Sequence, residues 1–341
     1  MSFFAYITYI MRNNLFILLL ILAAGCTKNS HSLDNGQPLD AYIFIDANVT
    51  KTKGNLIEGE YLPMEEGTAF GVWGARGDDK THIFDTYTTG KGNSRFNNVA
   101  KMHRPVDDDP FIYDELAMWT KNEDHSFYAY YPYDAESITE FSYTDDEPYL
   151  LYSQPTELAE MEDILTSAAE NLTYTSNNPV EMLFSHRLFA LDVVIKNTLP
   201  YELVLTKANV TIETYSGAKL YFDNSIQTDS NIEIYHSYID NDVTIDAASE
   251  SGEPFAYNLN EKEADGNSFL LLPDNTLKVV YSISFEDENG KTVNYEDKSY
   301  TFNNIEFTAG KKYALVLTRK GTTFTPQITE WTSKGVEHTF N

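Results

Sequence analysis

The chain has 341 residues, of which 52 are acidic and 24 are Lys or Arg, so its formal net charge is −28. Binding a phosphate backbone requires clustered basic residues, and this excess of carboxylates argues against nucleic acid as a partner. The single Cys excludes a disulfide framework, a Cys-based zinc site and a dithiol redox centre, while 42% hydrophobic residues suffice for packed cores.

The N-terminal residues 1–25 are typical of an export signal. With a start at either Met1 or Met11, Arg12 precedes an unbroken apolar run over residues 15–24. This run is shorter than the about 20 apolar residues that cross a bilayer. The run leads into Leu22-Ala23-Ala24-Gly25-Cys26, which resembles the lipobox of bacterial lipoproteins. That resemblance implies cleavage before Cys26 and attachment of a lipid whose acyl chains anchor the protein.

Residues 26–40 are polar, contain Gly and Pro and show no periodicity, so we interpret them as a flexible tether. The first predicted strand spans Tyr42 to Val49, with Ile43, Ile45, Ala47 and Val49 on one face. The same alternation of apolar and polar residues recurs along the chain, in residues 127–133, 191–195, 204–212, 279–285 and 313–317. These segments are rich in β-branched and aromatic residues, which favours strands.

Helical signals are scarce. Only Glu157–Glu170 has a helix-forming composition, and its C-terminal part fits a strand or loop equally well. Asn289-Gly290 separates two strand-like segments and predicts an antiparallel hairpin. Many short strands separated by turns predict an all-β fold of two tandem antiparallel β-sandwiches. A turn-rich break at Thr175–Pro179 suggests an N-terminal sandwich over residues 41–178 and a C-terminal sandwich over 179–341.

Catalytic motifs are absent from the sequence. It contains no G-x-S-x-G elbow, no phosphate-binding loop and no paired His ligands, so we expect no enzyme activity, no cofactor and no metal site. Four acidic clusters are interpreted as solvated turns, with calcium binding as the alternative; they lie at residues 107–109, 145–147, 240–242 and 286–288. Arg76-Gly77-Asp78 matches an integrin-type tripeptide, but three-residue motifs recur often by chance, so it is weak evidence for an adhesive role.

The three tryptophans, Trp73, Trp119 and Trp331, each lie beside strand-like sequence. This position favours burial in a core over an exposed platform for stacking sugars.

Several short motifs in order along the chain resemble fimbrillin-like lipoproteins of Gram-negative anaerobes. These motifs are Gly67-Thr68-Ala69-Phe70-Gly71-Val72-Trp73-Gly74, Ser126-Phe127-Tyr128-Ala129-Tyr130-Tyr131-Pro132-Tyr133, Asp163-Ile164-Leu165, Leu183-Phe184-Ser185-His186-Arg187-Leu188, Leu271-Leu272-Pro273, Gly310-Lys311-Lys312-Tyr313 and Ile328-Thr329-Glu330-Trp331. The resemblance implies two transthyretin-like, Greek-key β-sandwiches, export as a lipoprotein and a role as a subunit or anchor of surface fimbriae.

In polymerising members of that family, a protease cuts after a basic residue behind the first strand, and a strand from another subunit fills the groove that is left. The physical basis is strand addition to an open sheet edge. By this resemblance the candidate cleavage residues are Lys51 and Lys53, where stalk subunits usually carry Arg. An uncleaved subunit would instead be a fimbrial tip or anchor.

The sequence therefore predicts a structural fimbrial subunit, tip or anchor that supports adhesion. Its expected partners are other fimbrial subunits, joined by strand addition, and the outer membrane, reached through lipid on Cys26. Surface exposure is expected from the family resemblance. The alternative is a surface lipoprotein that binds a glycan or host ligand through its tryptophans or acidic loops without entering a fimbria.

Overall fold

The computed structural model describes residues 42–50, 61–63, 67–89, 94–104, 111–144, 147–174, 179–238, 242–262, 267–330 and 338–340. The predicted signal peptide and tether lie outside these residues, as do Cys26, Lys51 and Lys53. Regular structure in the described part is β-strand except for two short 3-10 turns, η2 (Leu158–Glu160) and η3 (Asn260–Lys262). No helix among these residues is long and apolar enough to cross a membrane. The predicted all-β fold is confirmed.

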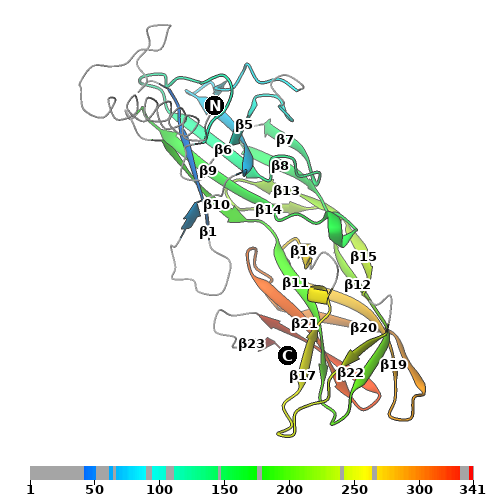
Figure 1. The fold of residues 1–341 in the computed structure, drawn as a ribbon. Coiled ribbons are helices and arrows are strands. Elements are labelled where there is room, and N and C mark those ends of the chain that lie inside the picture. The colour runs from blue at the N-terminus through cyan, green and yellow to red at the C-terminus, as the bar shows by residue number, and fades with distance from the viewer. Residues whose placement is uncertain are drawn as a thin grey trace, which may run out of the picture.

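The first lobe, in the upper half of Figure 1, is built from two sheets. The larger sheet has the order β2 (Tyr61–Pro63), β1 (Ile45–Thr50), β10 (Val180–His186), β9 (Leu165–Leu172), β6 (His125–Tyr131), β3 (Ala69–Arg76) and β4 (Thr81–His82), and β5 (Val99–His103) also pairs with β3. The smaller sheet has the order β14 (Ile226–Thr228), β13 (Gly217–Tyr221), β8 (Glu147–Ser153) and β7 (Ile138–Thr144).

Both faces of the larger sheet are buried at its centre. On one face, Tyr128 and Tyr130 pack against the smaller sheet in a core that includes Leu150 of β8. On the other face, Phe127 and Ala129 pack in a second core that is covered by connecting segments. Burial on both faces explains why β6 carries a continuous apolar run rather than strict alternation.

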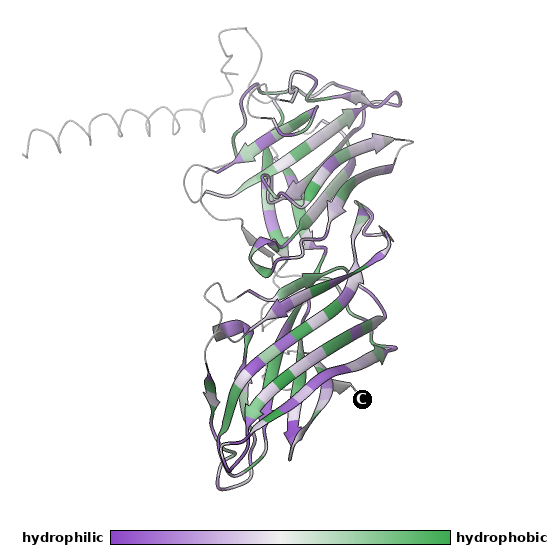
Figure 2. Ribbon diagram, turned by 90° about the vertical axis from the view of Figure 1, so that its right-hand side faces the viewer, coloured by the Kyte–Doolittle hydropathy of each residue, from purple (hydrophilic) through white to green (hydrophobic). Residues whose placement is uncertain are grey.

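The second lobe is also a sandwich. One sheet has the order β17 (Phe255–Asn258), β11 (Phe189–Asn197), β21 (Lys312–Lys320), β22 (Thr323–Glu330) and β23 (His338–Phe340), and β18 (Phe269–Leu271) also pairs with β11. The facing sheet has the order β15 (Asn231–Ser237), β12 (Leu203–Tyr215), β19 (Thr276–Glu286) and β20 (Thr292–Asn303), and β16 (Val243–Ile245) also pairs with β12. Alternate residues of these strands form one shared core, and Figure 2 shows the alternation of hydrophobic and hydrophilic residues along them.

Not every strand pair is antiparallel. β1 pairs in parallel with β10, and β11 pairs in parallel with β21. Each pair joins segments more than a hundred residues apart in the sequence, which leaves ample chain for the crossover that a parallel pair requires.

The chain passes between the lobes several times. β10, β13 and β14 all follow residue 179, yet they pair with first-lobe strands: β10 with β1 and β9, and β13 with β8. The predicted boundary between residues 178 and 179 therefore does not separate the sheets of the two sandwiches. A turn-rich break marks the end of a strand, but it carries no information about which sheet the next strand joins.

The segment with helix-forming composition, Glu157–Glu170, contains only η2 before the chain enters β9. Its side chains explain this conformation, because Leu158 and Met161 are buried in the second-lobe core and Ile164 in the first. Two hydrogen bonds add to the junction: Leu270 N donates to Met161 Sδ (3.2 Å) and Gln154 Nε2 donates to Leu270 O (3.0 Å). Packing on two cores at once has overridden helix propensity.

The hairpin predicted at Asn289-Gly290 is confirmed as the link between β19 and β20, but it is not a two-residue turn. Gly290 N donates to Asp287 O (2.9 Å) and Asp287 N donates to Lys291 O (2.9 Å), and Gly290 has φ 72°. This is a three-residue loop with a left-handed Gly. The Asp287 carboxylate accepts the N–H groups of Asn289 and Lys291, and these bonds lower its pKa.

His125 at the start of β6 is fully buried and has hydrogen bonds that suit only the neutral ring. Its Nδ1 lies 3.0 Å from Glu123 O, and its Nε2 accepts from Thr120 N (3.2 Å). Burial lowers the pKa of His125, with a smaller contribution in the same direction from Arg76. The unfolded chain therefore binds a proton at His125 more readily than the folded chain does. The contribution of the neutral ring to stability is fully present above the unfolded pKa of about 6.5 and is lost as the pH falls through that value.

We therefore expect His125→Gln to weaken the acid sensitivity of the fold. The variant should be less stable than the parent at about pH 7.5, and its stability should fall less between that pH and about pH 5. Urea denaturation at both pH values measures the difference. Equal losses in the parent and the variant would contradict the assignment.

Candidate functional site

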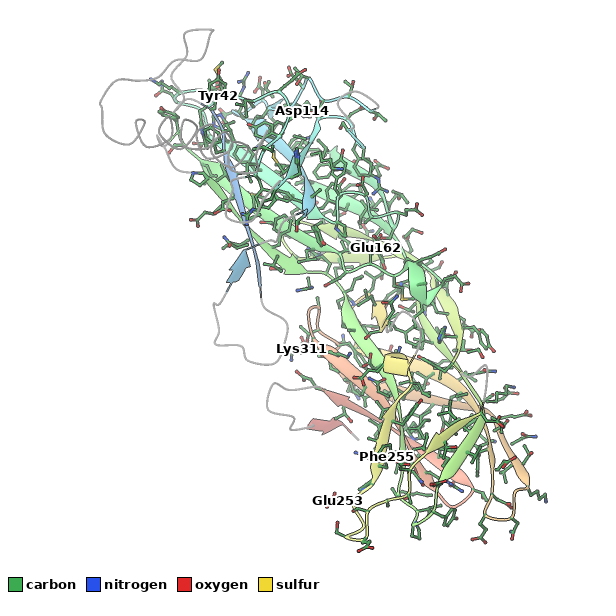
Figure 3. The ribbon with its side chains drawn as sticks, in the orientation of Figure 1. Tyr42, Asp114, Glu162, Glu253, Phe255 and Lys311 are labelled. Atoms are coloured by element: carbon green, nitrogen blue, oxygen red, sulfur yellow. The ribbon has the colours of Figure 1, made fainter. Side chains whose placement is uncertain are left out.

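The first strand and the groove that holds it form the most distinctive feature of the first lobe. β1 lies between β10 and the three-residue β2, pairing in parallel with β10 from Ile45↔Val180 to Val49↔Phe184. Tyr42, which precedes β1, lies at one end of the molecule, far from Glu253 and Phe255 at the other end (Figure 3). β1 runs from this end of the first lobe toward the middle of the molecule (Figure 1).

One face of the segment from Ile43 to Ala47 is enclosed, and Val49 farther along the same face is partly buried. Ile43, Ile45 and Ala47 are 0%, 1% and 0% exposed, which confirms the face predicted from alternation. They join a core that contains Phe70 and Phe184, whose ring centroids lie 5.2 Å apart. Burying the two Ile side chains contributes roughly 3–6 kcal/mol of gross apolar free energy.

Polar contacts fix the entry and the register of β1. Tyr113 donates its hydroxyl hydrogen to Ile43 O (2.6 Å), and burial raises the pKa of this Tyr. Ile43 N donates to Ala117 O (2.9 Å). Arg104 Nη2 bonds Asp46 Oδ1 (3.2 Å), and the guanidinium of Arg104 lies 4.4 Å above the ring of Phe111.

Loss of β1 would expose an apolar trough and one edge of β10. The core that the buried face of β1 joins also contains Met182, Phe184, Phe70 and Met102, all fully buried in the intact chain. β10 would also lose its backbone partners from Val180 to Phe184. An extended segment with apolar residues at alternate positions is the chemical complement of such a site.

The structure describes some of the residues singled out in the sequence and leaves others outside the described ranges. Cys26, Lys51 and Lys53 lie outside the described residues, so lipidation and cleavage stay predictions. Arg76 of the integrin-type tripeptide bonds Thr120 Oγ1 (2.7 Å) and lies 3.7 Å from the carboxylate of Glu123. Its side chain is thus engaged within the molecule.

Trp73 and Trp119 are core residues, 2% and 9% exposed, as favoured by the sequence. Trp73 stacks on Tyr143 with ring centroids 4.1 Å apart, and Trp119 meets His125 edge-on at 4.7 Å. Neither offers a free face for a sugar. Trp331 lies outside the described residues.

Among the acidic clusters, Glu286-Asp287-Glu288 forms the hairpin turn described above. Residues 107–109, 145–146 and 240–241 lie outside the described residues. Across the part of the chain that the structure describes, no group of three or more His, Cys, Asp or Glu side chains is arranged to hold a metal ion.

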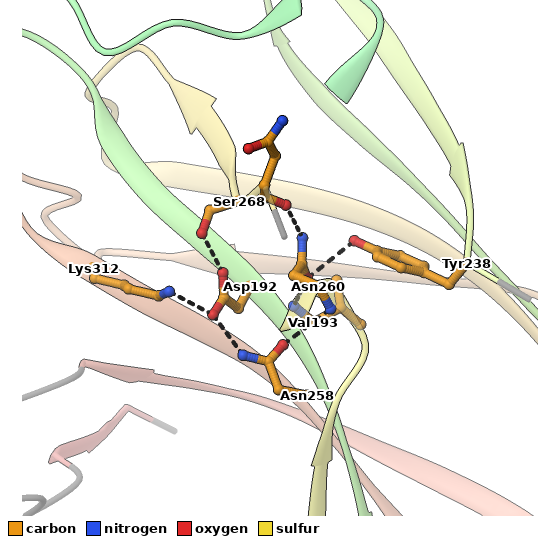
Figure 4. Close-up of polar contacts among 8 residues, drawn as sticks. Asp192, Val193, Tyr238, Asn258, Asn260, Ser268 and Lys312 are labelled. Carbon is orange, nitrogen blue, oxygen red and sulfur yellow. Dashed lines mark hydrogen bonds and ion pairs between the residues drawn. The ribbon is translucent and has the colours of Figure 1, made fainter. Parts of the chain in front are cut away.

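Sequence reasoning missed a buried polar network in the second lobe (Figure 4). Asp192 of β11 is 0% exposed, and its Oδ2 bonds Lys312 Nζ (2.7 Å) and Asn258 Nδ2 (2.8 Å), while Ser268 bonds its Oδ1. Beside it, Asn260 accepts from Val193 N (2.7 Å). The network fastens the segment from β17 to β18 onto β11. The sequence did contain one sign of this network, which is a single Asp inside the otherwise apolar run Phe189–Ile195.

Replacing Asp192 with Ala is expected to destabilise the second lobe by about 2–3 kcal/mol, because it leaves the donors of Asn258 and Ser268 without an acceptor. Chemical denaturation measures the change. Glu253→Ala, an exposed carboxylate at the far end of the same lobe (Figure 3), serves as the control and should change stability by less than about 0.5 kcal/mol. Equal stability of the two variants would show that the network is dispensable.

The family of the chain is decided by a sequence match over most of its length. A family model described as fimbrillin-like matches residues 52–331. The chain belongs to the fimbrillin-like family. No curated protein is a significant match to this fimbrillin-like sequence.

Two solved structures align with most of this fimbrillin-like chain. A fimbrial protein from Bacteroides vulgatus ATCC 8482 aligns with a TM-score of 0.57 at 17% identity, covering 86% of this chain and 100% of that one. The fimbrial anchor protein Mfa2 from Porphyromonas gingivalis aligns with a TM-score of 0.43 at 9% identity, covering 87% of this chain and 98% of that one. The first likeness establishes a common architecture of the two chains.

Proposed function

We propose that this fimbrillin-like protein is a structural component of a surface fimbria, and that β1 with its groove is the joint between subunits. Membership of the family supports a fimbrial role, and the relatives described as a fimbrial protein and a fimbrial anchor are consistent with it. The observation that carries the proposal is the enclosure of Ile43, Ile45 and Ala47 by a groove formed by other segments.

Strand exchange at this joint would require that β1 be separated from β2 and then replaced in its pairing with β10. β1 connects to β2 through residues 51–60, which include Lys51 and Lys53. A cut after either Lys would leave β1 joined to the rest of the fold by non-covalent contacts alone. These are its ladders with β10 and β2, the polar contacts of Ile43 and Asp46, and its apolar contacts. A strand with the same alternation on another subunit could then replace it without any change in the rest of the fold. Without a cut the groove stays filled, and the protein acts as a tip or an anchor.

Anchoring completes the proposal. Lipid on Cys26 would attach the protein to the outer membrane, with residues 26–40 as the tether. Cys26→Ala should move most of the protein from the membrane fraction to the soluble fraction of the cell envelope, as measured by immunoblotting. An unchanged membrane pool would contradict lipid anchoring.

N-terminal sequencing of protein released from the cell surface separates the stalk role from the anchor role. A start at Thr52 or Gly54 is the outcome expected of a stalk subunit. A chain that begins only at acylated Cys26 would assign it to the tip or anchor. Lys51→Ala combined with Lys53→Ala should abolish a start at either position.

A further inference from the structure

Exposed apolar side chains are concentrated in one segment of the first lobe. Of the seven large hydrophobic side chains exposed among the described residues, Ile112, Leu116 and Met118 fall within seven consecutive positions and are 45%, 41% and 42% exposed. The other four lie far apart in the sequence: Leu183, Tyr235, Phe255 and Tyr300. Single exposed hydrophobic residues are normal on a protein surface, whereas a group of them marks a contact site. Segment 112–118 is therefore a candidate contact site.

The fold holds these side chains outward. Phe111 and Tyr113, on either side of Ile112, are buried in the first-lobe core, and so is Trp119, which follows Met118. In extended backbone, a residue between two inward-facing neighbours faces the opposite way. The exposure of the apolar side chains is thus fixed by the large aromatic residues beside them.

Backbone hydrogen bonds fix the segment at both ends. Ile112 N donates to His103 O (3.0 Å), and His103 N donates to Ile112 O (3.1 Å). Near the other end, Ala117 O accepts from Ile43 N (2.9 Å), and the residue after Ala117 forms a β-bridge with Tyr42. The segment therefore lies against the residues at which the described chain enters the first lobe.

This position places the segment close to the proposed lipid. Asp114, within the segment, and Tyr42 lie at the same end of the molecule (Figure 3). In the sequence, 15 residues separate Tyr42 from Cys26. A stretch of this length reaches at most roughly 55 Å when fully extended. Lipid on Cys26 would therefore keep this end of the first lobe near the bilayer, where the tether makes repeated contact between the two surfaces frequent.

We infer that the exposed side chains of segment 112–118 dock on the surface of the lipid bilayer in which Cys26 is anchored. The inference rests on the proposed lipidation of Cys26. Membrane attachment strengthens with each additional apolar group that enters the interface. Asp114 and Glu115 lie between the apolar residues and are exposed. Anionic lipids would repel these two residues, so the contact suits a bilayer surface without net charge.

The test attaches the lipid chemically, so it does not depend on lipidation in the cell. Cys26 is the only Cys of the chain, and the mature chain can be coupled through it to a maleimide lipid in phosphatidylcholine vesicles. Added emission from a Leu116→Trp probe, measured against the coupled parent, should shift to the blue and be quenched by brominated phosphatidylcholine. A Tyr235→Trp probe, at an exposed position of β15 in the second lobe, should show neither effect.

Removal of apolar side chains should weaken docking. Added to the Leu116→Trp probe, Ile112→Ser together with Met118→Ser should lower the ratio of quenched to unquenched probe about ten-fold or more. The matched control is Tyr300→Ser, which removes an exposed side chain of β20 and should leave quenching unchanged. A circular dichroism spectrum that matches the parent shows that each variant is folded.

Three results would overturn the inference. They are absence of quenching at the Leu116→Trp probe, equal quenching at the probe in the second lobe, and equal quenching in the double Ser variant and its control. A fourth is the formation of dimers by the uncoupled chain that the double Ser variant abolishes, which would assign the segment to a second copy. These results leave lipidation itself to the Cys26→Ala fractionation, so the two proposals fail separately.

Discussion

A chain that has lost β1 is expected to form multimers, whereas the intact mature chain stays monomeric. Cutting the folded protein after Lys51 or Lys53 and removing the strand under mild denaturant would expose the trough beneath Ile43 and Ile45 and the edge of β10. An open apolar edge recruits another strand. Size-exclusion chromatography with light scattering measures the change, and the cut chain should also lose roughly 3–6 kcal/mol of stability.

A synthetic peptide of residues 42–50 should return the cut chain to a monomer. The matched control is the same peptide with Ile43→Asp and Ile45→Asp, which keeps the backbone donors but cannot fill the trough. Because the chain folds before it is cut, failure to fold is not a confounding factor. A cut chain that stays monomeric and keeps its melting temperature without the peptide would refute the proposed joint.

The second large effect is expected at the crossing from the second lobe into the first. Gly217 opens β13 opposite Ser153 of β8, and a Cβ built there would lie 2.4 Å from Tyr152 O. The obstacle is backbone, so no side-chain rotation relieves it. Gly217→Ala should therefore pull β13 away from β8 and destabilise the protein by about 3 kcal/mol or more.

Thermal and urea denaturation measure this loss, with Ser216→Ala as the neighbouring control. Ser216 is only partly buried, and its side chain makes one long contact, Oγ to Ser230 Oγ at 3.5 Å. Its backbone hydrogen bonds are kept in the variant, so the replacement should change stability by less than about 0.5 kcal/mol. A Gly217→Ala variant as stable as the control would show that β8 and β13 can separate without cost. The smaller sheet would then contribute little to the first lobe.

Local sequence patterns were informative wherever one face of a strand decides its conformation. The alternation at Ile43, Ile45 and Ala47 predicted the buried face of β1, and Asn289-Gly290 predicted the hairpin that follows β19. The burial of Trp73 also followed from its strand-like surroundings. The helix-forming composition of Glu157–Glu170 was misleading, because Leu158 and Met161 are drawn into a core on the other lobe.

The sequence by itself determined that the chain is built of strands, where the first strand lies and which of its side chains are apolar, because the side-chain period of a strand is local. The tertiary structure alone decided which strands are neighbours. The parallel pairing of β1 with β10, the return of β13 to the first lobe and the bridge between Tyr42 and Met118 all join segments distant in the chain. Periodicity does not specify such partners, because any apolar face fits many others until packing selects one.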